Sequence, residues 1–190
     1  MAFVEQGVTI TNYFAKTTDW SSYVDLPGAI AFGNNSNGQL GAADVTHRSS
    51  PTTVKSGSSW TDVAGQRLGA GIWFINQDNK LFHTGSLAPF VVGQNSSAFN
   101  SIQTSKLWTQ VSRGYRHTSA LRTDGTLWSW GLNTFGELGL NDLTNRSSPV
   151  QVGKSLWTQV AGGDKYTLAI RTDGTLWSWG SNFYGQLGLS

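Results

Sequence analysis

The chain has 190 residues, with 13 lysines and arginines against 11 aspartates and glutamates, so its formal net charge is +2. This even balance, without a run of basic residues, argues against binding to nucleic acid or to an anionic membrane through charge. The absence of cysteine excludes disulfides and thiolate metal sites. No apolar stretch approaches the roughly 20 residues that a membrane-spanning helix needs.

Residues 1–27 are predicted to form an N-terminal arm that precedes the repeats. The arm has no charged region followed by an apolar core, so we expect no secretory signal and synthesis in a cytoplasm. It is too rich in aromatic and aliphatic residues for a free tail. We interpret its run of Val8, Ile10, Tyr13 and Phe14 as a closing strand of the same chain or as an arm that docks onto another chain.

The 32 residues that begin at Trp108 are repeated from Trp157, 49 residues later, and 21 of the 32 aligned positions are identical. Repeats of this length, rich in glycine and tryptophan and without helical periodicity, indicate a stack or ring of small sheets. Two more degenerate copies precede them. The expected strands are residues 20–24 and 29–32 of the first copy, 60–64, 72–75 and 80–84 of the second, 108–111, 118–122 and 126–130 of the third, and 157–160, 166–171 and 175–179 of the fourth.

A tight turn is predicted between the last two strands of the third and fourth copies. Asp-Gly stands there at residues 124–125 and 173–174, and glycine accepts the positive φ that such hairpin turns require. In the strand that follows, period-2 alternation places Trp177 and Trp179 on one face of the sheet and Leu176 on the other.

The third strand of each copy ends at a glycine, at Gly33, Gly85, Gly131 and Gly180. After three of these glycines the loop reads G-x-N-x-x-G-x-L-G, and glycines at such fixed offsets imply positive φ or close backbone approach. A further strand is expected at residues 50–54 and 148–152, where proline suits an edge position. Four strands per unit of about 49 residues are typical of a β-propeller blade. We therefore predict an all-β fold over residues 28–190: an incomplete propeller of three to four four-stranded blades.

These motifs together resemble the RCC1-type (regulator of chromosome condensation) repeats. The resemblance rests on DGTLWSWG, on the G-x-N-x-x-G-x-L-G loop, on the Ser-Ser-Pro strand and on the V-x-x-G-x-x-H/Y-T segment. It is strong from residue 108 onward and poor over residues 66–104. The family implies seven-bladed propellers that mostly serve as protein-binding platforms. Seven such units would need roughly twice the residues present here. We therefore expect one of three arrangements: a strand formed by residues 8–14 completes the last blade, two half-rings close together, or the chain is part of an open array that its neighbours cap.

Residues 85–99, GSLAPFVVGQNSSAF, depart from the repeat pattern. At the place of the polar loop motif, these residues form an apolar segment instead. We interpret this segment either as a surface that binds a partner or a neighbouring subunit, or as local repacking within a degenerate blade. The candidate partner-binding residues are Leu87, Pro89, Phe90, Val91 and Val92.

The titratable residues do not suggest a catalytic or metal site. His117 stands where the next copy has Tyr166 and the worn copy has Leu68 or Gly69, which favours packing over proton transfer. Asp124 and its counterpart in the next copy occupy separate hairpin turns, where aspartate bonds locally, and no phosphate-binding or nucleophile motif occurs. We therefore expect no enzyme activity, no catalytic residues, no metal and no cofactor.

These observations predict a non-catalytic structural or protein-interaction module that works in a homo-oligomer or a larger assembly. The incomplete ring, the low charge and the apolar N-terminal segment favour a phage or virus particle component, such as a capsid decoration or a tail part, located in the virion and otherwise in the cytoplasm. One alternative is an RCC1-like regulator that binds a GTPase or chromatin. Another is a glycan-binding module that stacks sugars on exposed tryptophans, although blade-core tryptophans are the simpler interpretation.

Overall fold

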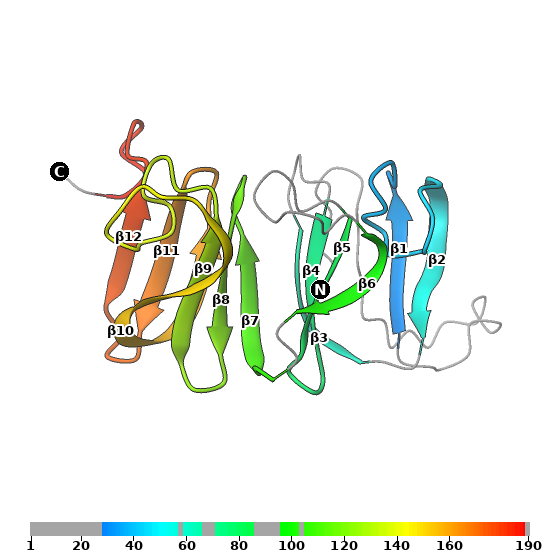
Figure 1. Ribbon diagram of the computed structural model, residues 1–190, viewed down its shortest axis with the longest axis horizontal. Helices are drawn as coiled ribbons and strands as arrows, with labels where there is room; N and C mark the ends of the chain where they lie inside the picture. Colours follow the sequence, from blue (N-terminus) through cyan, green and yellow to red (C-terminus); the bar gives the residue numbers. More distant parts are fainter. Residues whose placement is uncertain (1–27, 57–58, 66–70, 86–95, 103–104, 189–190) are drawn as a thin grey trace.

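The structure, a computed structural model, describes residues 28–56, 59–65, 71–85, 96–102 and 105–188. All regular elements in these ranges are β-strands (Figure 1). No helix long and apolar enough to cross a membrane occurs among the described residues. The all-β prediction is therefore confirmed.

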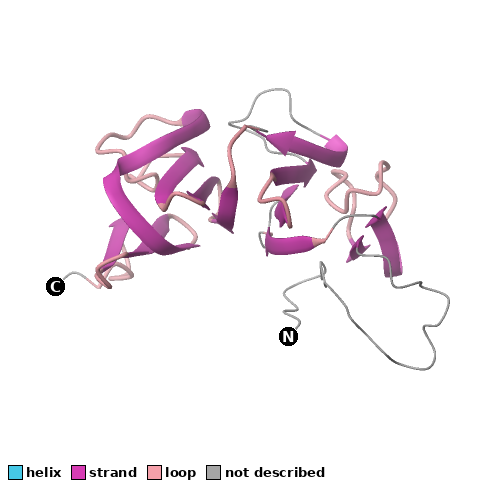
Figure 2. Cartoon of the chain, turned by 90° about the horizontal axis from the view of Figure 1, so that it is seen from below, coloured by secondary structure: helices cyan, strands magenta, loops and turns pink. Residues whose placement is uncertain are grey.

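The strands fall into three sheets that follow one another along the molecule (Figures 1 and 2). One has two strands, one has four, and one has six in the order β12-β11-β10-β9-β8-β7. The bounds are β1 Gly28–Gly33, β2 Arg48–Ser56, β3 Trp60–Ala64, β4 Gly71–Asn76, β5 Leu81–Gly85, β6 Ser96–Ile102, β7 Trp108–Arg113, β8 His117–Arg122, β9 Thr126–Gly131, β10 Arg146–Gly162, β11 Tyr166–Arg171 and β12 Leu176–Gly180.

The six-stranded sheet is two blades joined by one long strand. The first part of β10, from Arg146 to Leu156, pairs with β9, and the last part, from Trp157 to Gly162, pairs with β11. Strand β10 is thus both the outer strand of the third blade and the first strand of the last blade. Strands β3–β6 form a complete four-stranded blade, and β1 and β2 are the third and fourth strands of the blade before it.

Local sequence explains the hairpins that build each blade. At the β8–β9 turn Gly125 has φ +79°, and at the β11–β12 turn Gly174 has φ +84°. The carboxylate of Asp124 accepts hydrogen bonds from the backbone N–H (3.0 Å) and the hydroxyl (2.6 Å) of Thr126, which fixes the turn. The predicted hairpins at both Asp-Gly turns are confirmed.

The worn second copy differs from the prediction in two places. Strand β6, over Ser96–Ile102, lies partly within residues 85–99, the segment predicted to be an apolar connector. Gly71 pairs with Gly85 as His117 pairs with Gly131, so the counterpart of His117 is Gly71, and the expectation of Leu68 or Gly69 was wrong. The error arose because the connector between the first two strands is longer in this copy.

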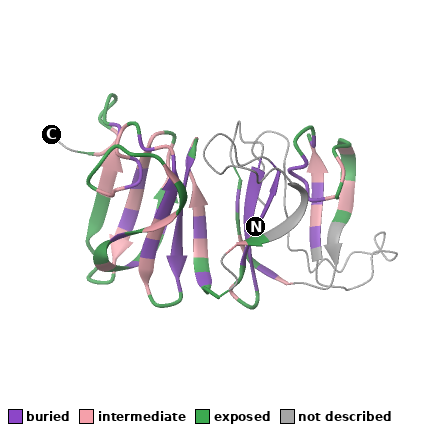
Figure 3. Cartoon of the chain, viewed as in Figure 1, coloured by how far each residue is buried: buried purple, intermediate pink, exposed green. Residues whose placement is uncertain are grey.

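The hydrophobic core lies between successive blades rather than inside any one sheet. Strands β4 and β8 are buried along their whole length (Figure 3). One cluster joins Trp73 and Ile75 of β4 to Trp108 of β7 and Trp130 of β9, and two further clusters join the other neighbouring pairs of blades. Because a small sheet cannot bury its own faces, each blade depends on the blades beside it.

Candidate functional site

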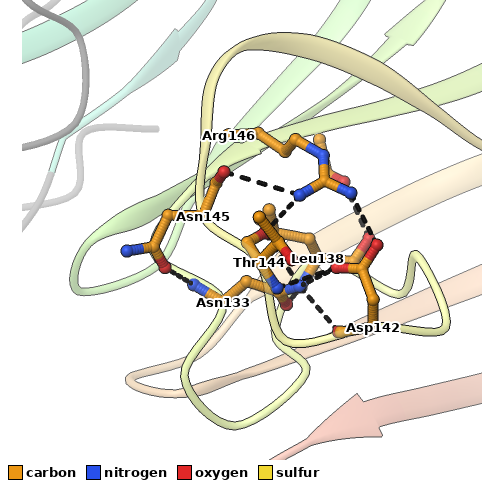
Figure 4. A network of polar contacts seen from close by, with 7 residues as sticks. Asn133, Leu138, Asp142, Thr144, Asn145 and Arg146 are labelled. Atoms are coloured by element: carbon orange, nitrogen blue, oxygen red, sulfur yellow. Dashed lines mark hydrogen bonds and ion pairs between the residues drawn. The ribbon is translucent and has the colours of Figure 1, made fainter.

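The loop after β9 is held by a network centred on Asn133 (Figure 4). Its side-chain amide donates to the carbonyl oxygen of Asp142 (2.8 Å), and its side-chain oxygen accepts from the N–H of Leu138 (2.9 Å). Asp142 is also paired with Arg146 at 2.6 Å. The backbone N–H of Thr144, followed by Arg146, lowers the pKa of Asp142. These polar groups satisfy one another, so the network serves to shape the loop.

The loop after β1 repeats this arrangement. Asn35 donates to the Asp44 carbonyl (3.0 Å) and accepts from the N–H of Leu40 (2.9 Å), while Arg48 pairs with Asp44 at 2.6 Å. Arg48 is the main cause of a lowered pKa at Asp44. The same geometry in two distant blades identifies the G-x-N-x-x-G-x-L-G motif as a structural device.

Polar side chains also join the first strands of neighbouring blades. The N–H of Val111 donates to the carboxylate of Asp62 (2.7 Å), and the N–H of Val160 donates to the side-chain oxygen of Gln110 (2.9 Å). Asp62 and Gln110 occupy the same repeat position, two residues after the first tryptophan of the blade. Burial raises the pKa of Asp62, although the N–H donors of Val111 and Val63 oppose this effect.

His117 lies between the third blade and the last blade. Its Nε2 is 2.9 Å from the hydroxyl of Thr167, which in turn donates to the carbonyl oxygen of Glu137 (2.9 Å). Burial, reinforced by the charge of Arg113, lowers the His117 pKa to about 4. Arg113 donates to the carbonyl of Gly71, and burial lowers its pKa to about 10. A neutral, buried histidine bonded to the next blade has a packing role.

The other candidate groups stay apart. Asp124 bonds Thr126 and Asp173 bonds Thr175, each within its own turn. In the part of the chain that the structure describes, no three His, Asp or Glu side chains gather as metal ligands. The predicted partner patch at residues 87–92 and the predicted closing strand at residues 8–14 lie outside the described residues.

Most of the tryptophans that the structure describes lie in the contacts between blades. Trp73, Trp108 and Trp130 are buried together, with the Trp73 and Trp130 ring centroids 5.2 Å apart. At the end of the array Trp177 is 43% exposed, and the guanidinium carbon of Arg171 lies 3.6 Å from its ring centroid.

The last blade exposes the face that the preceding blades bury. On the third blade, Leu121 and Leu127 are buried against Trp157, Val160 and other residues of the last blade. On the last blade, Leu176 occupies the position of Leu127 but is 68% exposed. Strand β12 is also the end of its sheet, with β11 as its one described neighbour. We call the face that carries Leu168, Ile170 and Leu176, with the adjacent edge of β12, the open face.

The open face was not among the predicted site residues. Alternation had placed Leu176 opposite Trp177 and Trp179, and this is confirmed, since Trp179 packs into the cluster with the third blade. Comparison with Leu127 in the previous copy would have marked Leu176 as a contact residue. Exposure depends on which blade follows, however, and alternation within a strand does not contain that information.

Comparison with known proteins identifies the repeat. The profile of the "Regulator of chromosome condensation (RCC1) repeat" matches residues 124–170, and a second profile of that repeat matches residues 108–137 and 157–186. The chain is 50% identical over 44 residues to the ultraviolet-B receptor UVR8 of Arabidopsis thaliana, which covers 23% of this chain and 10% of the receptor. It is 35% identical over 144 residues to the probable E3 ubiquitin-protein ligase HERC4 of Mus musculus, covering 70% of this chain and 13% of the ligase.

Solved structures share the fold. Human WBSCR16 superposes with a TM-score of 0.79 at 18% identity, over 99% of this chain and 49% of that one. Yeast RCC1 (Prp20), in its complex with Kap60, gives 0.68 at 19% identity, over 86% and 42%. The chain thus spans about an eighth or less of these curated relatives and under half of these solved chains. It is a partial β-propeller module of a type that typically binds proteins, and it belongs to the RCC1 repeat family.

Proposed function

We propose that this chain is a non-catalytic module that binds protein within an oligomer or a larger assembly, and that the assembly is a phage or virus particle, as a capsid decoration or a tail part. The single observation that carries the proposal is the open face. Among the described residues, the last blade presents an apolar face and a strand, β12, whose one described neighbour is β11. A surface of this kind favours association with other protein. A particle lattice covers such surfaces permanently, and outside the particle the chain is proposed to be cytoplasmic.

The use of the polar side chains supports a non-catalytic role. Asp62, Gln110 and His117 are all engaged in hydrogen bonds to the neighbouring blade. A general base must reach a substrate proton, whereas His117 is buried and faces Thr167. These three side chains therefore hold the blades together.

Mass spectrometry of gradient-purified particles, released by cells that carry the gene, tests the proposed setting. We expect the chain at a fixed copy number relative to the major capsid protein, unchanged after a high-salt wash. Absence from the particles, with the chain recovered in the soluble fraction, would overturn the virion assignment.

A regulator of a small GTPase is the second candidate, because the matched profile is that of the RCC1 repeat. A nucleotide-exchange assay on a Ran-like GTPase separates the two functions. We expect no acceleration of nucleotide release, and a concentration-dependent acceleration would replace the structural role with the regulatory one.

A further inference from the structure

We propose that the loops at one end of the third and last blades form a docking surface for an acidic segment of a partner protein. An apolar side chain of the partner contacts exposed aromatic rings, and its carboxylates pair with two cations beside them. We call this surface the aromatic patch; it consists of Arg116, Phe135, Leu143, Lys165 and Phe183. The inference rests on the proposed function, since it names the kind of protein that the module binds.

The aromatic patch joins loops that lie together at one end of the six-stranded sheet (Figure 1). The ring centroids of Phe135 and Phe183 lie 5.5 Å apart, edge to face. The ammonium group of Lys165 lies 5.0 Å from the centroid of the Phe135 ring. Leu143 lies beside Gly136, where an added Cβ would be 3.9 Å from the Leu143 Cδ2 atom. Side chains from two neighbouring blades therefore form one surface.

The loops do not need these aromatic side chains for their own shape. The first blade builds the same loop with Asn37 at the position of Phe135 and Ser36 at the position of Phe183. In both the first and the third blade, the backbone N–H at the first of these positions donates to the side chain two residues later, at 2.9 Å and 2.7 Å. Large exposed apolar side chains that the fold does not require indicate a contact with another molecule.

The exposure of the patch belongs to these positions of the blade. Phe183 is 74% exposed, and its counterparts Ser36 and Thr134 are also exposed, although their blades have an outer strand and a further blade after them. Leu143 is 66% exposed, and its counterpart Val45 in the first blade is 60% exposed. Neighbouring blades therefore leave these positions accessible.

Two cations flank the rings. Arg116 and Lys165 stand at the same position of successive blades, and neither forms an ion pair within the described part of the chain. The backbone N–H of Tyr115 donates to the carbonyl oxygen of Asp164 (3.0 Å), which holds the two turns side by side. Asp164 is the acid of these turns, and Asp142 on the adjacent loop is already in an ion pair.

This arrangement of charges favours an acidic partner. The remaining acid beneath the patch, Glu137, is 1% exposed, so it does not face a partner. Aromatic rings beside cations are enriched at the centres of protein interfaces. Carboxylates of the partner would compensate the partial desolvation of Arg116 and Lys165, whereas a basic segment would place like charges against them.

Selection of a random peptide library against the immobilised full chain tests the chemistry of the partner. We expect the recovered peptides to carry aspartate or glutamate on both sides of a leucine, phenylalanine or tryptophan. Recovery of basic peptides, of apolar peptides without acids, or of peptides with no common pattern would overturn the proposal.

The affinity of one recovered peptide for variants of the chain then locates the contact. The double variant Phe135→Asn with Phe183→Ser installs the first-blade residues and should raise the Kd at least about tenfold, as expected for central interface residues. Lys165→Glu should raise the Kd by a similar factor at low salt and by less at high salt, because salt screens exposed charges.

Each change has a matched control that should bind the peptide like the wild type. Leu107→Ser alters an apolar side chain that is 44% exposed at the opposite end of the strands, and Lys154→Glu alters an exposed lysine of β10. Equal circular dichroism and melting temperature verify that all variants fold. An unchanged Kd in the double variant, or an equal loss of affinity in the controls, contradicts the proposal.

Light scattering over a concentration series distinguishes an acidic partner from a second copy of the chain. We expect the native mass of the double variant to equal that of the wild type at every concentration. Self-association of the wild type that the double variant abolishes would assign the patch to a second copy and overturn the acidic partner.

The two proposals fail separately. A chain that is present at fixed copy number in particles but selects no acidic peptides retains the proposed function and loses this inference. A chain that binds acidic peptides through the aromatic patch but is absent from particles retains the inference and loses the virion assignment.

Discussion

Leu127 and Leu176 stand at the same position of two successive blades, within an identical sequence, DGTLWSWG. Leu127 is fully buried, whereas Leu176 is 68% exposed. The third blade is followed by a blade that covers it, and the last blade has no described blade after it. The comparison teaches that each repeat encodes two contact faces, and that burial of the second face depends on the next repeat.

Truncation of the two leucines gives the largest expected difference. Leu127→Ala should lower the free energy of unfolding by about 2–5 kcal/mol, because it leaves a cavity between blades. Leu176→Ala should change it by less than about 0.5 kcal/mol in dilute samples, where chains do not associate. Urea unfolding measures both, and equal losses would show that the last blade is covered even in the monomer.

Acidification tests the contact around His117. The folded-state pKa is about 4, below the unfolded value of 6.5, so the unfolded chain binds more protons in this window. The contribution of His117 to the free energy of unfolding is fully present above pH 6.5. It decreases as the pH falls, and the loss reaches about 3 kcal/mol at pH 4. Asp142 has a lowered pKa and therefore contributes only at still lower pH.

The matched variant for this window is His117→Tyr, which installs the residue that the last blade has at the same position, Tyr166. In the variant, the free energy of unfolding should no longer fall between pH 7 and pH 4. An unchanged slope would assign the acid sensitivity to other groups.

Two glycines isolate the steric part of the comparison. Gly139 and Gly188 both have φ +67°, so alanine strains the backbone equally at each. A Cβ at position 139 would lie 2.8 Å from the Trp179 ring, whereas one at position 188 meets nothing within 4 Å. Gly139→Ala should therefore cost about 1–3 kcal/mol more than Gly188→Ala. Thermal melts of the two variants measure the difference, and identical melting temperatures would mean that Trp179 moves aside freely.

The smallest expected effect concerns the polar contacts between first strands. Gln110→Ala removes the acceptor of the Val160 N–H and should cost about 1 kcal/mol. Gln159→Ala, at the same repeat position in the last blade, should leave the free energy of unfolding unchanged in dilute samples, because the side chain of Gln159 is exposed. Chemical denaturation of both variants provides the check, and a loss at Gln159 equal to that at Gln110 would point to a bond within the monomer.

The strands were predicted most accurately from the sequence where the repeat copies are most similar to one another. Strands β8, β9 and β11 and both Asp-Gly turns follow from alternation and turn chemistry between residues 108 and 188. Strand β6 did not, because Ser96–Ile102 is rich in serine and asparagine, which have low strand propensity, and its pairing with β5 makes it a strand. The single long strand β10 was predicted as two separate strands for a similar reason, since no local signal tells whether one strand serves two blades.

The sequence by itself determined the all-β class, the blade repeat, the hairpin turns and the faces of β12, because φ preferences and period-2 alternation are local properties of a strand. Only the tertiary structure decided that Asp62 and Gln110 join blades, that His117 faces Thr167, and that Leu127 is buried while Leu176 is exposed. The reason is physical: burial and desolvation come from contacts about 49 residues apart in the chain, so identical repeats acquire different environments from their neighbours.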